Sequence, residues 1–599
     1  MITPVLKNEY ANMPRTDYPR PMWMRNEWYS LNGEWEFEFD FGVSGEERKW
    51  YENGEFSKKI TVPFCPESKL SGIGCVDFMP AVWYRKKINI ELLGKHRAIL
   101  HFGAVDYESK VWVNGHLCGT HKGGYCGFEY DVTDYLCKGE NVIVVMAKDD
   151  LRSKRQPYGK QCATYHSRAC SYTRTTGIWQ TVWFEYVPEV YLLSPKITPH
   201  AADGVVDLEI RSSCFNMSGY SVKLTAFYDG KEVGTSAARF AGDCASARLS
   251  VSEVHLWDIL APELYDLKVE LLDADGAAVD TVWGYFALRD ISYNKTGLTV
   301  NGRPVFMRLI LDQGFNPDGI YTAPDAEFLK KDIELSISLG FNGARLHQRV
   351  FEERTLYYAD RLGYMVWAEQ ADGIDLSNGE GTELFLPEWM EIVKSHYNHP
   401  SVVGWCPFNE TYHAMNLHKE THTTVYHVTK ALDPYRPVID ASGGVHYETD
   451  MYDVHDYEQN PEKLASYLAP MLDDPMTFHS PVKWYRGDAP KYPEPYAGQP
   501  YWVSEYGGTF WNPNIVSDGK GGWGYGSAPK TEEEFAKRYE GLTDVLLSHP
   551  RVCGFCYTQL TDIEQEQNGL YFYDRSKKFS DSVYQRIRAI NLKKAAIEE

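Results

Sequence analysis

The arrangement of apolar residues changes near residue 289, and this change constrains the fold more than any other feature. Before it, short alternating apolar segments are separated by turn signals, among them the hairpin dipeptide Asn114-Gly115. After it, strand-like apolar runs alternate with segments of helical apolar spacing, such as 325–339. The first pattern is typical of β-sandwiches, and the second of parallel strands covered by helices. With 599 residues, the chain is also too long for one hydrophobic core, so we expect several domains.

These patterns divide the chain into three expected domains. Residues 1–187 contain short strands and turns that fit a jelly-roll sandwich. Residues 188–288 contain further short strands over the length of an immunoglobulin-like β-sandwich. Residues 289–599 repeat strand–helix units over a length that suits a (β/α)8 TIM barrel. The predicted fold is therefore multidomain, with two all-β sandwiches before a TIM barrel.

Two apolar runs of the third region end abruptly at a glutamate, Glu410 and Glu505. Counted from Val305, these runs are the fourth and seventh strands of the expected barrel, and barrel enzymes keep their chemistry at strand ends. A lone glutamate there is most often a solvated rim residue or a helix cap. These two have particular neighbours, because Asn409 offers an amide to a sugar hydroxyl and Gly507-Gly508 leaves space beside the second carboxylate. Two such carboxylates are what glycoside cleavage requires, so we expect a glycosidase.

Composition argues against several other classes of protein. The net charge of −22 disfavours binding to nucleic acid and to anionic membrane surfaces, which both select basic patches. No apolar run reaches the length of a membrane-spanning helix, and the N-terminal residues lack a signal-peptide core. The cysteines are scattered, and Cys553 and Cys556 lie in a strand-like run without a second such pair, which favours buried thiols over a metal or redox site. We therefore expect a cytoplasmic protein that uses no metal and no cofactor.

Short motifs along nearly the whole chain occur in the order found in glycoside hydrolase family 2. They are Leu31-Asn32-Gly33-Glu34-Trp35, Trp83-Tyr84-Arg85, Val113-Asn114-Gly115, Thr176-Gly177-Ile178-Trp179, Val300-Asn301-Gly302-Arg303-Pro304, Asn398-His399-Pro400-Ser401, Asn409-Glu410 and Ser504-Glu505-Tyr506-Gly507. By these motifs the chain resembles that family, which includes β-galactosidases, β-glucuronidases and β-mannosidases. The resemblance implies a sugar-binding jelly roll at the start and a retaining exo-glycosidase in the barrel. It also implies that Glu410 is the general acid/base and Glu505 the nucleophile.

The resemblance implies contacts between the sugar site and several further residues. Asn409 is expected at the 2-hydroxyl, Arg345 near the nucleophile, and Tyr457 in a hydrogen bond to the nucleophile. For Tyr457, a packed loop aromatic is an equal alternative. The remaining candidates are Asp312 for a sugar hydroxyl, His347 at a position shifted by one from the family's histidine, Trp511 as a stacking wall or a packed aromatic, and Tyr557 where the family often has tryptophan.

The expected sugar follows from one departure from the family pattern. β-Glucuronidases hold the substrate carboxylate with an Asn-x-Lys signature, and this chain has Asn568-Gly569-Leu570 in the corresponding region. We therefore expect a β-galactosidase, with Arg345 and Arg349 as the arginines that could replace the missing cation. The alternatives are a β-glucuronidase, a β-mannosidase or an arabinopyranosidase, and a non-catalytic carbohydrate-binding protein is disfavoured by the two glutamates. The expected partner is a carbohydrate substrate, a homo-oligomer is left open, and neither nucleic acid nor a membrane is expected.

Overall fold

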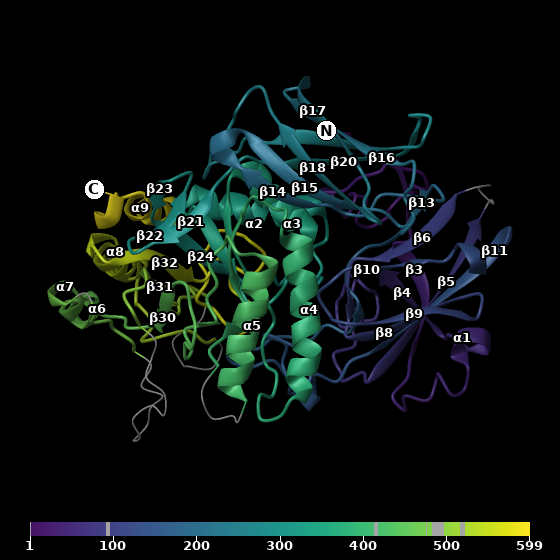
Figure 1. Ribbon diagram of the computed structural model, residues 1–599. Coiled ribbons are helices and arrows are strands. Elements are labelled where there is room, and N and C mark those ends of the chain that lie inside the picture. The colour runs from purple at the N-terminus through teal and green to yellow at the C-terminus, as the bar shows by residue number, and fades with distance from the viewer. Residues whose placement is uncertain are drawn as a thin grey trace.

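The structure is a computed structural model that describes residues 2–90, 96–411, 417–474, 476–481, 496–514 and 522–598. Figure 1 shows a group of strands in purple and blue, a second group of strands in teal above it, and a green-to-yellow part in which helices surround strands. The expected architecture of two β-sandwiches and a TIM barrel is confirmed. Among the residues that the structure describes, no helix is both long and apolar enough to cross a membrane.

The first part consists of two mostly antiparallel sheets whose inner faces share one core. One sheet has the strand order β1 (Val5–Leu6), β2 (Glu27–Ser30), β13 (Val182–Val187), β6 (Arg97–Phe102) and β10 (Phe128–Asp131). The other has the order β4 (Lys58–Val62), β3 (Gly33–Phe39), β5 (Ala81–Ile90), β11 (Gly139–Lys148), β8 (Glu108–Val113) and β9 (His116–Lys122). Alternate residues such as Trp35 and Phe37 fill the shared core, because successive strand side chains point to opposite faces.

The second part is a smaller antiparallel sandwich. One sheet has the strand order β14 (Lys196–His200), β15 (Val205–Arg211) and β18 (Cys244–Ser250). The other has the order β17 (Lys231–Arg239), β16 (Ser221–Tyr228), β19 (Tyr265–Leu272) and β20 (Ala278–Phe286). Burial alternates along β19, so one face of this sheet packs into the core. A small sheet of β21 (Ile291–Asn294), β22 (Gly297–Val300) and β23 (Arg303–Val305) follows, and its apolar residues pack against the start of the first barrel strand.

Seven parallel strands form a continuous sheet in the third part. Their order is β27 (Val402–Cys406), β26 (Met365–Glu369), β25 (Gly343–Leu346), β24 (Met307–Asp312), β32 (Val552–Thr558), β31 (Tyr501–Gly507) and β30 (Tyr452–Asp456). The fifth strand, expected at Val438–Asp440, lies beside β27, where Trp405 forms backbone hydrogen bonds of 3.0 and 2.9 Å with Pro437 and Ile439. Just beyond it, β29 (Ala441–Ser442) pairs in parallel with β28 (Phe408–Asn409).

Helices cover the outside of this barrel, and α4 and α5 lie in front of it in Figure 1. They are α2 (Ala326–Ser338), α3 (Glu353–Leu362), α4 (Glu380–His396), α5 (His418–Leu432), α6 (Pro461–Leu468), α7 (Pro470–Asp473), α8 (Glu532–Ser548) and α9 (Asp581–Asn591). The side chains of Asp325 and Thr531 cap α2 and α8 by accepting hydrogen bonds from backbone N–H groups of the first turn. The helix expected at 325–339 is therefore α2.

Side chains of the barrel strands alternate between the barrel interior and the helix layer. Leu309 and Leu311 of β24 belong to an interior cluster in which Trp367 stacks on Trp502 from the other side of the barrel, at 5.4 Å between ring centroids. Ile310, between these leucines, belongs instead to the core under the helices. The alternation decides which of the side chains near the strand ends can meet at the barrel mouth.

Candidate active site

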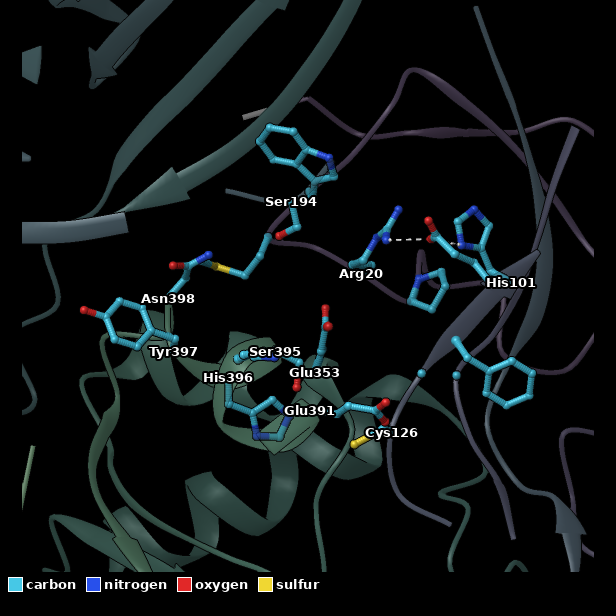
Figure 2. Close-up of a pocket in the computed structure, with 18 of the residues that line it drawn as sticks. Arg20, His101, Cys126, Ser194, Glu353, Glu391, Ser395, His396, Tyr397 and Asn398 are labelled. Atoms are coloured by element: carbon cyan, nitrogen blue, oxygen red, sulfur yellow. Dashed lines mark hydrogen bonds and ion pairs between the residues drawn. The ribbon is translucent and has the colours of Figure 1, made fainter. Parts of the chain in front are cut away.

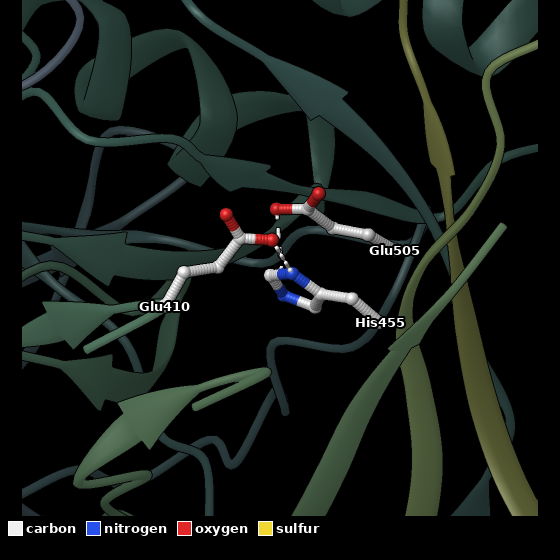
Figure 3. A group of neighbouring side chains, drawn as sticks. All are labelled: Glu410, His455 and Glu505. Atoms are coloured by element: carbon white, nitrogen blue, oxygen red, sulfur yellow. Dashed lines mark hydrogen bonds and ion pairs between the residues drawn. The ribbon is translucent and has the colours of Figure 1, made fainter. Parts of the chain in front are cut away.

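Glu410 and Glu505 lie together at the carboxyl ends of the fourth and seventh barrel strands. Glu505 is buried within β31, whereas Glu410 follows β28 with a left-handed φ of 51°. The N–H of Glu410 donates to Ser442 O at 2.8 Å, which fixes this turn. One oxygen of each carboxylate and one ring nitrogen of His455 lie within 4.8 Å of one another. Figure 3 shows the two carboxylates side by side with the His455 ring next to both.

Glu505 is surrounded by hydrogen-bond donors that favour its ionised form. Arg345 Nη1 donates to Oε1 at 3.1 Å, the Tyr457 hydroxyl donates to Oε2, and His455 Nε2 lies 3.4 Å from Oε1. Burial opposes the charge of this carboxylate, but the charges of His455, His347 and Arg345 together hold its pKa below the ordinary value. An ionised carboxylate in this position can act as a nucleophile.

Arg345 is held in place by partners on three other strands. Its Nε donates to Glu369 Oε1 at 2.5 Å, and Nη2 donates to Asn409 Oδ1 at 3.0 Å. His347 points to the same side, with Nδ1 at 3.0 Å from Glu369 Oε2 and Nε2 at 3.8 Å from Glu505 Oε1. The buried Asn409 Nδ2 has no hydrogen-bond partner among the described residues, so this amide is a free donor for a ligand hydroxyl.

Glu410 and His455 form a short hydrogen bond of 2.6 Å between Oε1 and Nδ1. Burial raises the pKa of Glu410, but the hydrogen bond and charge of His455, with Lys160 and Arg345, lower it to about 2. Burial likewise opposes the charged His455, but the carboxylates of Glu505 and Glu410 raise its pKa above the ordinary value. The proton of this pair therefore resides on His455 in the free site, and it must be on Glu410 when that residue acts as an acid.

The three groups of Figure 3 are also of the types that bind metal ions. Two ligands of one tetrahedral zinc ion lie about 3.3 Å apart, given bonds of about 2 Å. The 2.6 Å between Glu410 and His455 is shorter and is that of a hydrogen bond, and Glu505 is already held by Arg345 and Tyr457. The arrangement therefore fits two carboxylates held by hydrogen bonds to neighbouring side chains better than a metal centre.

Asp312 and Tyr557, both predicted to contact the sugar, are not brought to this pair. Each follows an interior residue of its strand, so its side chain points to the helix layer. The charges of Asp332 on α2 and of Arg575 act on Asp312, whose pKa is raised to about 7 by burial and by Asp332. The Tyr557 ring packs 4.8 Å from the ring of Tyr539 on α8. The predictions for these two residues ignored the inward and outward alternation of the strand.

The remaining loop aromatics have different outcomes. Tyr457 donates to Glu505, as the resemblance implied, and its ring stacks on Tyr525 at 3.4 Å with an interplanar angle of 7°. Trp511 stacks on Phe579 at 6.1 Å between ring centroids, and the indole N–H has no hydrogen-bond partner among the described residues, so its role as a stacking wall stays a prediction. The sequence reasoning missed Tyr525, which follows no strand, and His455. The latter could have been found, because it lies near the end of the sixth strand, two residues before Tyr457.

A cavity of about 620 Å³ at the junction of the three parts is separate from this pair. Figure 2 shows Arg20 and His101 from the first part facing Glu353, Glu391 and His396 from the barrel. Neither catalytic candidate is among its described lining residues. Arg20 and His101 in its wall already form ion pairs with Glu129, and Arg20 also pairs with Glu185. The cavity is therefore a gap between packed domains and not the site of the carboxylates.

Two β-sandwiches followed by a parallel barrel, with two adjacent glutamates at strands four and seven, are the architecture of a multidomain glycoside hydrolase. Family models agree with this class along the chain. The glycosyl hydrolases family 2 sugar binding domain matches residues 28–182, the glycosyl hydrolases family 2 model matches 190–289, and the family 2 TIM barrel domain matches 291–514. The chain belongs to glycosyl hydrolase family 2.

Individual relatives are more distant. A protein of Formosa agariphila named a putative beta-glucuronidase is 28% identical over 55% of this chain and 40% of its own length. A beta-galactosidase of Pectobacterium atrosepticum is 24% identical over 69% of this chain and 42% of its own length. The chain thus spans less than half the length of these two curated relatives. The solved structure of a Lactobacillus rhamnosus beta-glucuronidase has a TM-score of 0.77 over 98% of this chain and all of that one, at 19% identity, which is a likeness of fold.

Proposed function

We propose that the protein is a retaining exo-β-glycosidase, with β-glucuronides as its leading substrates. The observation that carries this proposal is the short distance between Glu410 and Glu505. Retaining enzymes place their two carboxyl groups about 5–5.5 Å apart, and inverting enzymes about 6.5–9.5 Å apart to admit a water. Oxygens within 4.8 Å of each other support the retaining geometry.

The reaction follows from the environments of the two carboxylates. Glu505 attacks the anomeric carbon, the bond from that carbon to the aglycone oxygen breaks, and Glu410 gives its proton to this oxygen. A water then attacks the same carbon and gives a proton to Glu410. The bond between this carbon and Glu505 breaks, so the sugar is released and Glu505 is regenerated. Arg345 and Tyr457 keep Glu505 ionised and oriented before attack. The Asn409 amide is available to the 2-hydroxyl, where a hydrogen bond strengthens as positive charge develops on the sugar ring.

The relatives favour a glucuronide over the β-galactoside expected from the sequence. The name beta-glucuronidase belongs to the Formosa agariphila relative and to the Lactobacillus rhamnosus structure described above. A β-galactosidase is the second candidate, because the Pectobacterium atrosepticum relative has that name and because Asn568-Gly569-Leu570 lacks a lysine.

Hydrolysis of 4-nitrophenyl β-D-glucuronide and β-D-galactoside tests the proposal directly. Glu505→Gln should lower kcat by at least about a thousandfold, since the covalent route is lost. Glu420→Gln, on the exposed side of α5, is the matched control and should keep the full rate. Proton NMR of the first product should show the β-anomer. An α-anomer, or a Glu505→Gln enzyme with the native rate, would refute the retaining assignment.

A further inference from the structure

A β-glucuronidase must hold the carboxylate of a uronic acid, and this inference rests on the function proposed above. A carboxylate that leaves water needs a cation with hydrogen-bond donors. The expected region offers none, because Asn568 is followed by Gly569-Leu570. The amide of Asn568 is also occupied, since its Nδ2 donates to Glu566 at 2.9 Å and its Oδ1 accepts from Gln559 at 2.9 Å. The cation must therefore come from elsewhere in the chain.

The two arginines considered from the sequence are both engaged. Arg345 uses its three nitrogens on Glu369, Glu505, Asn409 and a backbone carbonyl, and its side chain is 1% exposed. Arg349 donates to two backbone carbonyls, and its guanidinium lies 4.3 to 5.1 Å from three aromatic rings.

A nearby lysine is engaged as well. Lys578 reaches the region of the missing signature, where its ammonium lies 3.2 Å from Gly569 O. It pairs with Asp562 at 2.5 Å, and its side chain has no exposed surface. It is a structural ion pair that a substrate does not reach.

A segment of the first part, residues 158–173, is seated on the mouth of the barrel. On one side, the N–H groups of Tyr158 and Gly159 donate to Asp372 O, just after the third barrel strand, at 2.9 and 2.8 Å. On the other side, the Tyr172 hydroxyl donates to Glu566, beyond the eighth strand. The segment therefore bridges the loops after the third and eighth strands, which are the sheet neighbours of the fourth and seventh strands.

Lys160 lies within this bridging segment and is half-buried. Its carbonyl accepts from Tyr172 N at 2.8 Å, so its backbone is fixed. Among the described residues, its ammonium forms no hydrogen bond and no ion pair. We propose that Lys160 is the residue that binds the carboxylate of a uronic acid sugar held between Glu410 and Glu505.

The charges around Lys160 agree with this placement. Burial lowers the pKa of Lys160, but its neighbours raise it above the ordinary value; they are Cys170, Glu410, Glu505 and Glu566. Glu410, Glu505 and Glu566 attract the ammonium electrostatically, but none of them forms an ion pair with it. The ammonium therefore lies near the catalytic pair and has no direct anionic partner among the described residues. A substrate carboxylate in the intervening space would supply that contact.

A comparison of two substrates that differ only at this group tests the proposal. 4-Nitrophenyl β-D-glucuronide carries a carboxylate where the β-D-glucoside carries a hydroxymethyl group. Lys160→Met should lower kcat/KM for the glucuronide by about a hundredfold, the size of a lost charged hydrogen bond. The rate for the glucoside should change less than about threefold, and Lys160→Arg should keep part of the glucuronide activity. Lys154→Met, an exposed lysine close in the chain, is the matched control.

The outcomes separate this inference from the proposed function. Equal losses of kcat/KM on both substrates would mean that Lys160 acts on the enzyme's own carboxylates. Native kcat/KM on both substrates would mean that Lys160 does not touch the substrate. Either result overturns the inference. A wild-type enzyme that retains configuration but cleaves only neutral sugars overturns it as well, while the glycosidase stands. If no glycoside is cleaved at all, the proposed function fails, and calorimetric binding of D-glucuronate decides about Lys160. Binding weakened about tenfold or more by Lys160→Met supports the contact, and binding left unchanged refutes it.

Discussion

Replacement of Glu410 by alanine should slow bond cleavage most for leaving groups that need a proton donor, and it should also slow the attack of water on the glycosyl-enzyme. Glu410 is the proposed proton donor next to Glu505, and general acid catalysis contributes about 10² to 10⁴ in rate. In the wild type, His455 Nδ1 lies 2.6 Å from Glu410 Oε1. The variant keeps His455, which can act as a less effective proton donor. We therefore expect the lower half of that range, a loss of about 100-fold to 1,000-fold, or about 3 to 4 kcal/mol.

The assay compares two glucuronides with different leaving groups. With methyl β-D-glucuronide, whose alkoxide leaves poorly, Glu410→Ala should show the full loss in kcat/KM. With the 4-nitrophenyl glucuronide, the first step should be nearly native, and the glycosyl-enzyme should accumulate. Added azide should then raise turnover and give a β-glycosyl azide, because it needs no general base and fits the space left by the carboxylate. An equal loss with both leaving groups, and no response to azide, would refute the assignment of Glu410.

Two further predictions concern the contacts between the first part and the barrel. A Cβ on Gly159, at φ 56°, would lie 2.2 Å from a backbone carbonyl oxygen of the second strand's loop, so Gly159→Ala should displace the segment and lower kcat/KM for the glucuronide by about tenfold or more. Gly74→Ala has a similar φ of 66° and open space, and should keep the native kcat/KM. Burial of Glu388 on α4, which accepts from Tyr125 N at 3.0 Å, raises its pKa from 4.5 to about 8. The folded state therefore holds this proton more tightly than the unfolded chain, and the stability that this group contributes falls as pH rises from about 5 to about 8. The Tm of Glu388→Gln should decline less over that pH range than the Tm of the wild type. Parallel declines of the two Tm values would contradict the raised pKa.

The sequence predicted most of the fold because its signals are local. Apolar alternation, helix spacing and strand ends are properties of neighbouring residues, and they led to the barrel and to Glu410 and Glu505. Asp312 and Tyr557 were wrongly predicted to contact the sugar. To place them, one must know which residues of each strand point into the barrel and which point out, and this depends on the register in which the strand pairs with its neighbours.

Lys160 required more than the register of a strand. It reaches the site through hydrogen bonds between a sandwich segment and a barrel loop about two hundred residues later, and no local pattern encodes this contact. His455 is an intermediate case, since it lies near the end of a barrel strand but in no motif that indicated its role.

Because residues 158–173 of the first domain sit on the barrel, the catalytic residues and the residue proposed to select the sugar lie in different domains. In the proposed enzyme, the residues that break the glycosidic bond belong to the barrel, where they share hydrogen bonds with Arg345, His455 and Tyr457. A residue that selects the sugar belongs to a surface segment of another domain, which can vary without disturbing the barrel strands. Such a protein can acquire a new substrate by substitutions in its first domain alone. Chimeras that exchange this sandwich between relatives would therefore transfer specificity while the barrel sequence stays the same.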